Sequence, residues 1–365
     1  MGGRVRIHLL STAVAPLGSG LGGGVEQMII NAARQLDTLG YEVRVIAPAG
    51  SVAEVPILHT LPGRLAPTAV ALARDAPPVI AVDSFLAAAL RELQIGLDPK
   101  DVILNFSYDW LPLFVSGLLP CPLGTLVSMG SLNDFLDQEI RHIALRHPER
   151  LAWLSAAQAA SFGLQDAPRL IPPGLDLTRY RYNVHPRRAL CWLGRIAPEK
   201  GLDDVFTLAT RTGQTVTLFG PMQDPAYWET LRCRHPDAPI DYGGFLDTST
   251  LAETVGDFQA LLMTPKWLEA FGIVGIEALA CGTPVLAYRN GGIQDYVRDG
   301  ETGWLVQPGD VDALCAAVAR IAYLDRAACR ALVEKRYTLA QYGRALVNWL
   351  HALAEAPMDP SGVTA

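Results

Sequence analysis

Charged residues are scarce in this sequence, and acidic ones outnumber basic ones. Asp, Glu, Lys and Arg make up 18% of the 365 residues, and the formal net charge is −7 at pH 7. A protein that binds nucleic acid irrespective of sequence normally presents a broad basic face, so we expect no nucleic-acid partner. Half of the residues are hydrophobic, which excludes a mainly disordered chain and allows a large buried core.

Long apolar runs and paired cysteines are also missing. No uninterrupted apolar stretch approaches the roughly 18 residues that span a bilayer, so no membrane insertion is expected. The run after Arg4 and Arg6 extends only from Ile7 to Leu10 and includes His8, which is too short and too polar for a signal peptide. The six cysteines show no C-x-x-C spacing, so buried free thiols are expected rather than zinc ligands or disulfides. We therefore expect a soluble, cytoplasmic protein.

Strand-like and helix-like stretches alternate along the whole chain. This alternation predicts the α/β class, with two doubly wound, Rossmann-like domains facing each other across a cleft. The periodicity fails between Pro172 and Arg188, where we place the linker. Helical spacing covers 25–39, and an apolar stripe covers 339–353. The expected strands are 5–10, 42–47, 79–82, 102–106, 125–129, 151–155, 189–193, 215–219, 240–242, 260–263 and 284–287.

Two glutamates flank the start of a helix predicted over 272–281. The first turn of a helix leaves backbone N–H groups unpaired, and the helix dipole favours an anion there. A hexose–diphosphate–ribose ligand fits the order Glu269, the amides of 272–274 and Glu277, with the carboxylates accepting hydrogen bonds from hydroxyls. The alternative is two solvated glutamates beside an ordinary helix. Glu277 stands in an otherwise apolar run, where an unpaired carboxylate is costly, and this favours the functional interpretation.

A basic loop follows the strand expected at 189–193. It runs from Gly194 to Gly201 and contains Arg195 and Lys200, which places two cations at the carboxyl edge of a sheet. Both are suited to neutralising a diphosphate leaving group, although a solvated basic turn has the same composition.

A glycine-rich loop follows the first expected strand. Gly22, Gly23 and Gly24 have no side chains, which allows the backbone to approach a ligand closely. A tight strand-to-helix turn is the alternative. A nicotinamide-binding fingerprint is disfavoured, because the G-x-G-x-x-G spacing is not clean and no acidic residue ends the second strand.

Two other patterns are weaker indications of chemistry. Asp310-Val311-Asp312 has the D-x-D form of some metal-dependent glycosyltransferases, but it follows Pro308-Gly309 and opens a helix, so capping is the better interpretation. His142 and His147 are five residues apart and do not share a helical face.

Taken together, these motifs resemble the retaining glycosyltransferases of family four, which have the GT-B architecture. The E-x7-E segment, the G-R-x-x-x-x-K-G loop, the glycine-rich loop and the Ile-Pro-Pro-Gly-Leu-Asp segment at 171–176 occur in the family's order. The resemblance implies that catalysis rests on Arg195 and Lys200 at the donor diphosphate and on Glu269 at the transferred sugar. The residues implied to bind the donor are Gly23, Gly24, Arg195, Lys200, Glu269, Phe271, Gly272, Ile273, Val274 and Glu277, the last at the ribose.

The family architecture also implies how the chain is divided. An acceptor-binding domain would comprise 1–172 together with the last helix, 338–355. Residues 173–337 would bind the nucleotide sugar. Residues 356–365 would form a tail. No metal and no cofactor are expected, only small-molecule donor and acceptor substrates.

One position departs from the family pattern. Many members carry a histidine after the strand expected at 125–129, whereas this chain reads Leu-Val-Ser-Met-Gly-Ser over 126–131. Retaining chemistry in the family is usually attributed to front-face displacement, in which the leaving phosphate helps to deprotonate the acceptor. Ser128 or Ser131 is expected to supply the polar contact that the histidine would make.

A narrower resemblance lies mostly in the N-terminal half. Residues 11–20, 105–112, 128–132 and 262–267 are similar to cyanobacterial UDP-glucose:tetrahydrobiopterin glucosyltransferases. This implies glucose transfer from UDP-glucose to a reduced pterin, a flat molecule with a guanidine-like edge of N–H donors. Tyr108 or Trp110 would stack on it, and Asp109 would accept from that edge. Alternatively, the two aromatics pack at a strand end and Asp109 caps a turn.

Other activities are compatible with the same motifs. A hexosyltransferase acting on another sugar, lipid or small molecule would share the donor site. A nucleotide-sugar epimerase has the same architecture and needs no acceptor, and a degenerate member would only bind. The oligomeric state leaves no signature in the sequence.

Overall fold

The computed structural model describes residues 5–164 and 167–356, and the chain divides into two compact units. The first unit comprises residues 1–174 and 339–365, and the second comprises 175–338. The division therefore lies two residues beyond the expected one, and the final helix belongs to the first unit. The tail expected at 356–365 lies, apart from Ala356, outside the described residues.

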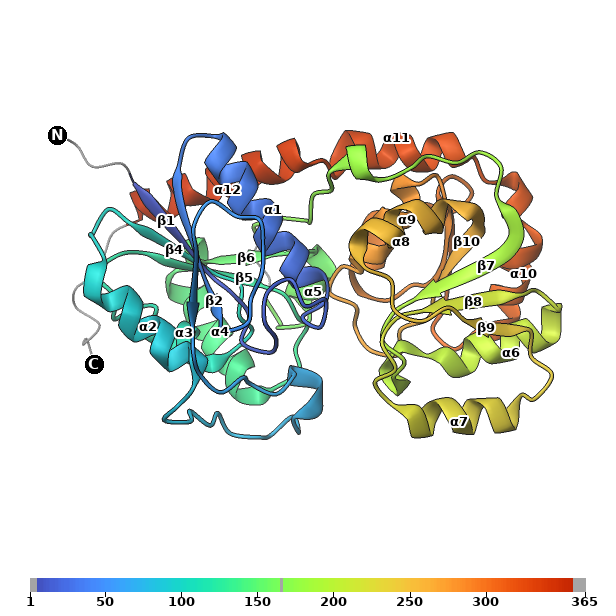
Figure 1. The fold of residues 1–365 in the computed structure, drawn as a ribbon, viewed down its shortest axis with the longest axis horizontal. Helices are drawn as coiled ribbons and strands as arrows, with labels where there is room; N and C mark the ends of the chain where they lie inside the picture. Colours follow the sequence, from blue (N-terminus) through green and yellow to red (C-terminus); the bar gives the residue numbers. More distant parts are fainter. Residues whose placement is uncertain (1–4, 165–166, 357–365) are drawn as a thin grey trace. The chain divides into compact units, whose positions relative to one another are not determined.

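Within the described residues, the first unit is built on a six-stranded parallel sheet in the order β3-β2-β1-β4-β5-β6 (Figure 1). Its strands are β1 (Arg6–Leu10), β2 (Glu42–Pro48), β3 (Leu58–Leu61), β4 (Val102–Asn105), β5 (Leu123–Val127) and β6 (Leu151–Trp153). Its α-helices are α1 (Gly24–Thr38), α2 (Phe85–Gly96), α3 (Trp110–Val115), α4 (Asp134–Arg146), α5 (Ala156–Ala160) and α12 (Leu339–Glu355).

The described part of the second unit contains another six-stranded parallel sheet, in the order β12-β11-β10-β7-β8-β9. Its strands are β7 (Arg187–Leu193), β8 (Val216–Phe219), β9 (Ile240–Tyr242), β10 (Phe258–Met263), β11 (Val285–Tyr288) and β12 (Gly303–Val306). Its α-helices are α6 (Leu202–Thr212), α7 (Pro225–Arg234), α8 (Thr248–Thr254), α9 (Ile273–Ala280), α10 (Val311–Ala319) and α11 (Arg326–Arg336). The predicted α/β class with doubly wound sheets is confirmed.

Each sheet has one point where the strand order reverses. In the first unit β1 lies between β2 and β4, and in the second β7 lies between β8 and β10. Open α/β sheets bind ligands beyond the carboxyl ends of the strands at this point. The loops after β1 and β4 therefore share one candidate edge, and those after β7 and β10 share another.

The last helix packs on the first one, as Figure 1 shows for α12 and α1. Tyr342 donates its hydroxyl hydrogen to the Met28 carbonyl at 3.2 Å, and the Trp349 indole N–H donates to the Glu149 carbonyl at 2.7 Å. The stripe expected over 339–353 is buried at Tyr342, Leu346, Trp349, Leu350 and Leu353.

One strand prediction was wrong, and two strands were missed. Residues 79–82 are not a strand: they follow Pro77 and Pro78, which lack N–H donors for a ladder, and Val79 and Val82 are 86% and 93% exposed. The strands β3 and β12 were not predicted. Both are edge strands with one neighbour, so neither carries the continuous apolar run of a central strand.

All six cysteines are free thiols. Four are buried as expected, whereas Cys233 is exposed and Cys315 is half-buried. Within the part of the chain that the structure describes, no helix combines the length and the apolar character needed to cross a membrane.

Candidate functional site

The basic loop after β7 is locked against the loop after β10. Residues 198–200 form a 3-10 helix, and Gly201 follows with a φ of 70° before α6 begins. A Cβ at Gly201 would lie 1.9 Å from the Thr264 carbonyl oxygen, so this approach requires glycine. The Thr264 hydroxyl donates to the Gly201 carbonyl at 2.9 Å. The two loops are therefore joined at the carboxyl edge of neighbouring strands.

Arg195 is held by polar partners on its own side of the loop. Its guanidinium lies 3.1 Å from the Glu199 carboxylate and also donates to the side-chain oxygen of Gln223. The Arg195 side chain remains 26% exposed, which leaves part of its fork of donors available to a ligand.

Lys200 and Glu269, which were predicted from separate motifs, form an ion pair between the two loops. The Lys200 ammonium lies 2.7 Å from Oε2 of Glu269, and both side chains are largely buried. The indole N–H of Trp267 donates to the same oxygen at 3.3 Å, and its ring centroid lies 4.8 Å from the ammonium. No described residue donates to Oε1 of Glu269. One carboxylate oxygen is therefore occupied and the other is available.

The helix α9 begins one residue after its predicted start, with backbone donors unused. Gly272 precedes it with a φ of 77°, and no side chain caps the helix. Ile273 and Val274 are half-buried, and no described residue accepts a hydrogen bond from their amides. Phe271 is buried against Tyr296 and Tyr337, so only its backbone can face a ligand. The entrance of α9 has the free N–H groups that bind anions.

Glu277 lies further along α9 and is buried. Its Oε1 accepts a hydrogen bond from the Tyr180 hydroxyl at 2.8 Å, while no described residue donates to Oε2. Burial raises the pKa of the Glu277 carboxyl, and the bond from Tyr180 opposes that shift. Glu277 is thus a carboxylate fixed through one oxygen, as a group that receives a hydroxyl would be.

The glycine-rich loop of the first unit is organised around Glu26, in the first turn of α1. The Glu26 carboxylate accepts from the amides of Gly18 at 2.7 Å, Gly20 at 3.1 Å and also Gly22. Glu26 is 4% exposed, so this part of the loop already surrounds a negative charge. Gly23 and Gly24 lie just beyond these contacts, and their donor-binding role remains a prediction.

The residues predicted to bind the acceptor after β4 all have internal contacts. Asp109 caps α3 by accepting from the Leu111 amide at 2.9 Å, and burial raises the pKa of its carboxyl. Trp110 stacks on Phe114 with ring centroids 4.5 Å apart, and Tyr108 donates to the Gly130 carbonyl at 3.0 Å. The capping and packing interpretations are therefore correct, while the acceptor roles remain predictions.

Ser131, after β5, belongs to a charged network. Its hydroxyl donates to Asp137 at 2.5 Å and accepts from Arg74 at 2.9 Å. Arg74 also pairs with Asp137 at 3.0 Å and with Asp134 at 2.9 Å, so two carboxylates surround this one guanidinium. Ser128 is half-buried, and no described residue hydrogen-bonds to its hydroxyl.

The D-x-D pattern caps a helix, as expected. Asp310 accepts from the Ala313 amide at 2.8 Å at the start of α10, and Asp312 pairs with Arg211. Over 5–164 and 167–356, no three His, Cys, Asp or Glu side chains are grouped so that they could hold a metal ion.

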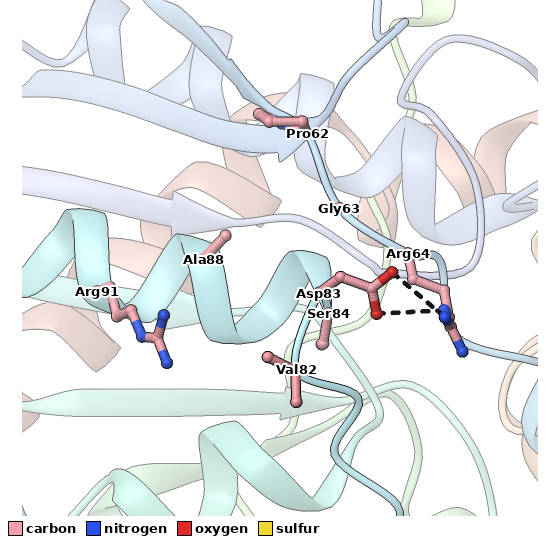
Figure 2. A pocket seen from close by; sticks show the side chains of 8 residues that line it. All are labelled: Pro62, Gly63, Arg64, Val82, Asp83, Ser84, Ala88 and Arg91. Atoms are coloured by element: carbon pink, nitrogen blue, oxygen red, sulfur yellow. Dashed lines mark hydrogen bonds and ion pairs between the residues drawn. The ribbon is translucent and has the colours of Figure 1, made fainter.

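A separate open pocket lies between the segment after β3 and the start of α2 (Figure 2). The pair Arg64–Asp83, 3.3 Å apart, lies at one side of it and Arg91 at another. Its other lining residues are 62, 63, 82, 84 and 88. None of the predicted site residues lines this pocket.

Sequence reasoning missed three residues of these arrangements. Trp267 and Tyr180 each contact a predicted glutamate, and Glu26 fills the glycine loop. Glu26 was detectable, because a carboxylate two residues after a run of glycines can return to their amides. Tyr180 lies 97 residues from Glu277, a distance at which spacing carries no signal.

Comparisons with known proteins find glycosyltransferases. Residues 183–344 match the family model of the group 1 glycosyl transferases. A D-inositol 3-phosphate glycosyltransferase of Rhodococcus jostii (strain RHA1) is 28% identical, over 82% of this chain and 78% of the relative. A D-inositol 3-phosphate glycosyltransferase from Mycobacterium sp. (strain KMS) is also 28% identical, over 94% of this chain and 91% of the relative.

Solved structures share the fold. AviGT4, a glycosyltransferase of avilamycin A biosynthesis, superposes with a TM-score of 0.70 at 20% identity, covering 96% of this chain and 98% of that one. Anabaena Alr3699/HepE in complex with UDP-glucose superposes with a TM-score of 0.73 at 16% identity, covering 95% and 99%. The chain has the GT-B fold and is a glycosyltransferase.

Proposed function

We propose that this chain transfers glucose from UDP-glucose to a reduced pterin such as tetrahydrobiopterin, with retention of the anomeric configuration. The observation that carries the donor half is the Lys200–Glu269 pair beside the unused amides of Ile273 and Val274. The complex of Anabaena Alr3699/HepE with UDP-glucose supports the choice of donor.

The donor roles follow from the chemistry of each group. Arg195 and Lys200 would neutralise the diphosphate together with the α9 amides, because cations and oriented N–H groups stabilise the charge that develops on a leaving phosphate. Glu269 would accept a glucose hydroxyl through Oε1, and Glu277 a ribose hydroxyl through Oε2. Because the two cations already supply positive charge, we propose that no metal is required, and EDTA should leave turnover unchanged.

The transfer itself exchanges one bond for another. The acceptor hydroxyl oxygen bonds to the anomeric carbon on the face from which UDP leaves, and the bond from that carbon to the β-phosphate oxygen breaks. UDP takes the electron pair, and a phosphate oxygen receives the hydroxyl proton. The side chains of this unit therefore need only hold the donor and stabilise the departing phosphate.

The charges after β4 and β5 favour an acceptor that donates hydrogen bonds over one that carries a phosphate. Asp109 supplies one carboxylate, and the Arg74 network contains two more, Asp134 and Asp137, with Arg141 3.7 Å from Asp137 as its second guanidinium, so the carboxylates outnumber the guanidinium groups. A phosphorylated acceptor would have to displace a carboxylate from Arg74 before pairing with it. The guanidine-like edge of a pterin needs no such exchange, because it donates to carboxylates directly.

A phosphorylated polyol is the second candidate acceptor, and the names of the curated relatives favour it. Mass spectrometry after incubation with UDP-glucose separates the candidates. A product one hexose heavier than tetrahydrobiopterin supports the proposal, whereas glucosylated inositol phosphate and no pterin product would refute it. Conversion of the nucleotide sugar to its epimer without any acceptor would indicate an isomerase instead.

A further inference from the structure

We infer that Trp267 is a positioning residue that holds the sugar-binding carboxylate of Glu269 while Lys200 engages the diphosphate. This inference rests on the proposed function of the donor site. Trp267 lies in the loop between β10 and α9, two residues before Glu269. Its indole N–H and the Lys200 ammonium donate to the same oxygen, Oε2 of Glu269.

The backbone around Trp267 is anchored on two sides. The Trp267 carbonyl accepts from the Asn290 side-chain amide at 2.7 Å, and the Glu269 carbonyl accepts from the Gly292 amide at 2.9 Å. Gly291 has a φ of 67°, and a Cβ there would lie 2.0 Å from the Glu269 carbonyl oxygen. This close contact fixes the loop, so the indole and the carboxylate keep their relative place.

Binding of UDP-glucose affects the two groups that donate hydrogen bonds to Oε2 of Glu269 differently. A diphosphate attracts the Lys200 ammonium and competes with Glu269 for it. The Trp267 N–H is neutral, so the diphosphate draws it less strongly, and it can keep its bond to Oε2. Glu269 then retains its orientation, with Oε1 directed to the sugar hydroxyl. The indole face also attracts the Lys200 ammonium, which lies 4.8 Å from the ring centroid, through a cation–π contact.

Two tryptophan substitutions test this role. Trp267→Phe keeps an aromatic face for Lys200 but removes the N–H. The matched control is Trp304→Phe, because Trp304 also has a cation on its ring, Arg320 at 3.5 Å, while its indole N–H has no hydrogen-bond partner among the described residues. The readouts are the Kd of UDP, the Kd of UDP-glucose, the preference for UDP-glucose over UDP-galactose, and the Tm.

Trp267→Phe should raise the Kd of UDP-glucose about tenfold and reduce the preference for UDP-glucose over UDP-galactose. Glu269 loses the one hydrogen bond for which the diphosphate does not compete. The Kd of UDP should change less than twofold, and Trp304→Phe should change neither Kd. The inference is overturned if Trp267→Phe binds UDP-glucose like the wild type, or if it weakens UDP and UDP-glucose equally. These readouts involve no acceptor, so an incorrect pterin assignment would not affect them. A wild type that binds neither nucleotide would overturn the proposed donor site and this inference with it.

Discussion

Two helices of this chain, α1 and α9, begin after a glycine, and the backbone amides at the two starts differ in whether the protein supplies them with an anion. Before α1, the amides of Gly18, Gly20 and Gly22 surround a carboxylate that the chain itself supplies, Glu26. Before α9, Gly272 opens a helix whose first amides meet no acceptor among the described residues. Both loops lie at a reversal point of a parallel sheet, so topology alone does not separate them.

This difference shows that glycines indicate where the backbone can bind an anion. They do not indicate whether that anion is a side chain of the protein or a ligand. The site before α1 is largely satisfied within the fold, so its glycines serve first to shape the loop. The first amides of α9 meet no acceptor among the described residues, and we propose that they take a ligand, with one oxygen on each of Glu269 and Glu277 free of described donors. We therefore place the principal anion contacts of the donor at α9.

The largest expected effect comes from removing the cation beside the α9 entrance. Lys200→Ala should lower kcat/KM by about 10²–10³, because a stabiliser of the leaving phosphate is lost. Lys266→Ala is the control, since that exposed lysine in the facing loop pairs with Asp203. Steady-state kinetics with varied UDP-glucose measure both. Turnover of Lys200→Ala within threefold of the wild type would contradict the assigned role.

Neutralising the internal anion should affect folding rather than donor binding. Glu26→Gln should reduce the free energy of unfolding by about 2 kcal/mol, because the amides of Gly18, Gly20 and Gly22 lose a charged acceptor. The Kd of UDP should change less than threefold. Glu54→Gln, at an exposed pair with Arg34, should change stability by at most about 0.5 kcal/mol. Denaturant unfolding would measure the stability and titration calorimetry the Kd of UDP. If Glu26→Gln strongly weakened UDP binding and left stability unchanged, the proposed difference between the loops before α1 and α9 would be wrong.

Alanine at Gly23 sharpens the same comparison. Gly23 has a φ of 67° and a ψ of −152°, and a Cβ there would meet no atom within 4 Å, so Gly23→Ala should cost only the backbone strain, about 1–3 kcal/mol. Gly272→Ala adds a contact of 2.7 Å with the Met263 methyl carbon and should also weaken UDP binding. If Gly23→Ala weakened UDP binding more than Gly272→Ala did, the donor phosphates would belong to the loop before α1.

The smallest expected effect is a gain in stability. Glu277→Gln keeps an acceptor for the Tyr180 hydroxyl and removes a buried charge, so it should stabilise the fold by about 1 kcal/mol at pH 7 and weaken UDP binding. Burial raises the pKa of Glu277 above its usual 4.5, so the charge opposes folding only once the group ionises. The gain should therefore disappear below about pH 4. Thermal unfolding at pH 7 and pH 4 would measure it, and a gain that persisted at pH 4 would refute this account.

Much of the fold was predictable, because central parallel strands bury both faces and leave apolar runs such as 102–104. The edge strands β3 and β12 lack that run, and the apolar residues of 79–82 follow two prolines and stay exposed. The motifs that contain Lys200 and Glu269 were recognisable singly, since each lies in a loop that follows a central strand. Their direct pairing, and the bonds from Trp267 and Tyr180, depend on side-chain conformations that no spacing encodes.

Hydrogen exchange of the backbone amides with and without UDP tests the central claim most directly, since it reports which amides the ligand covers. We predict that UDP slows exchange in the peptide containing Gly272, Ile273 and Val274, and changes it little in the peptide containing Gly18, Gly20 and Gly22. Protection confined to the glycine loop before α1, with none at the start of α9, would contradict the account.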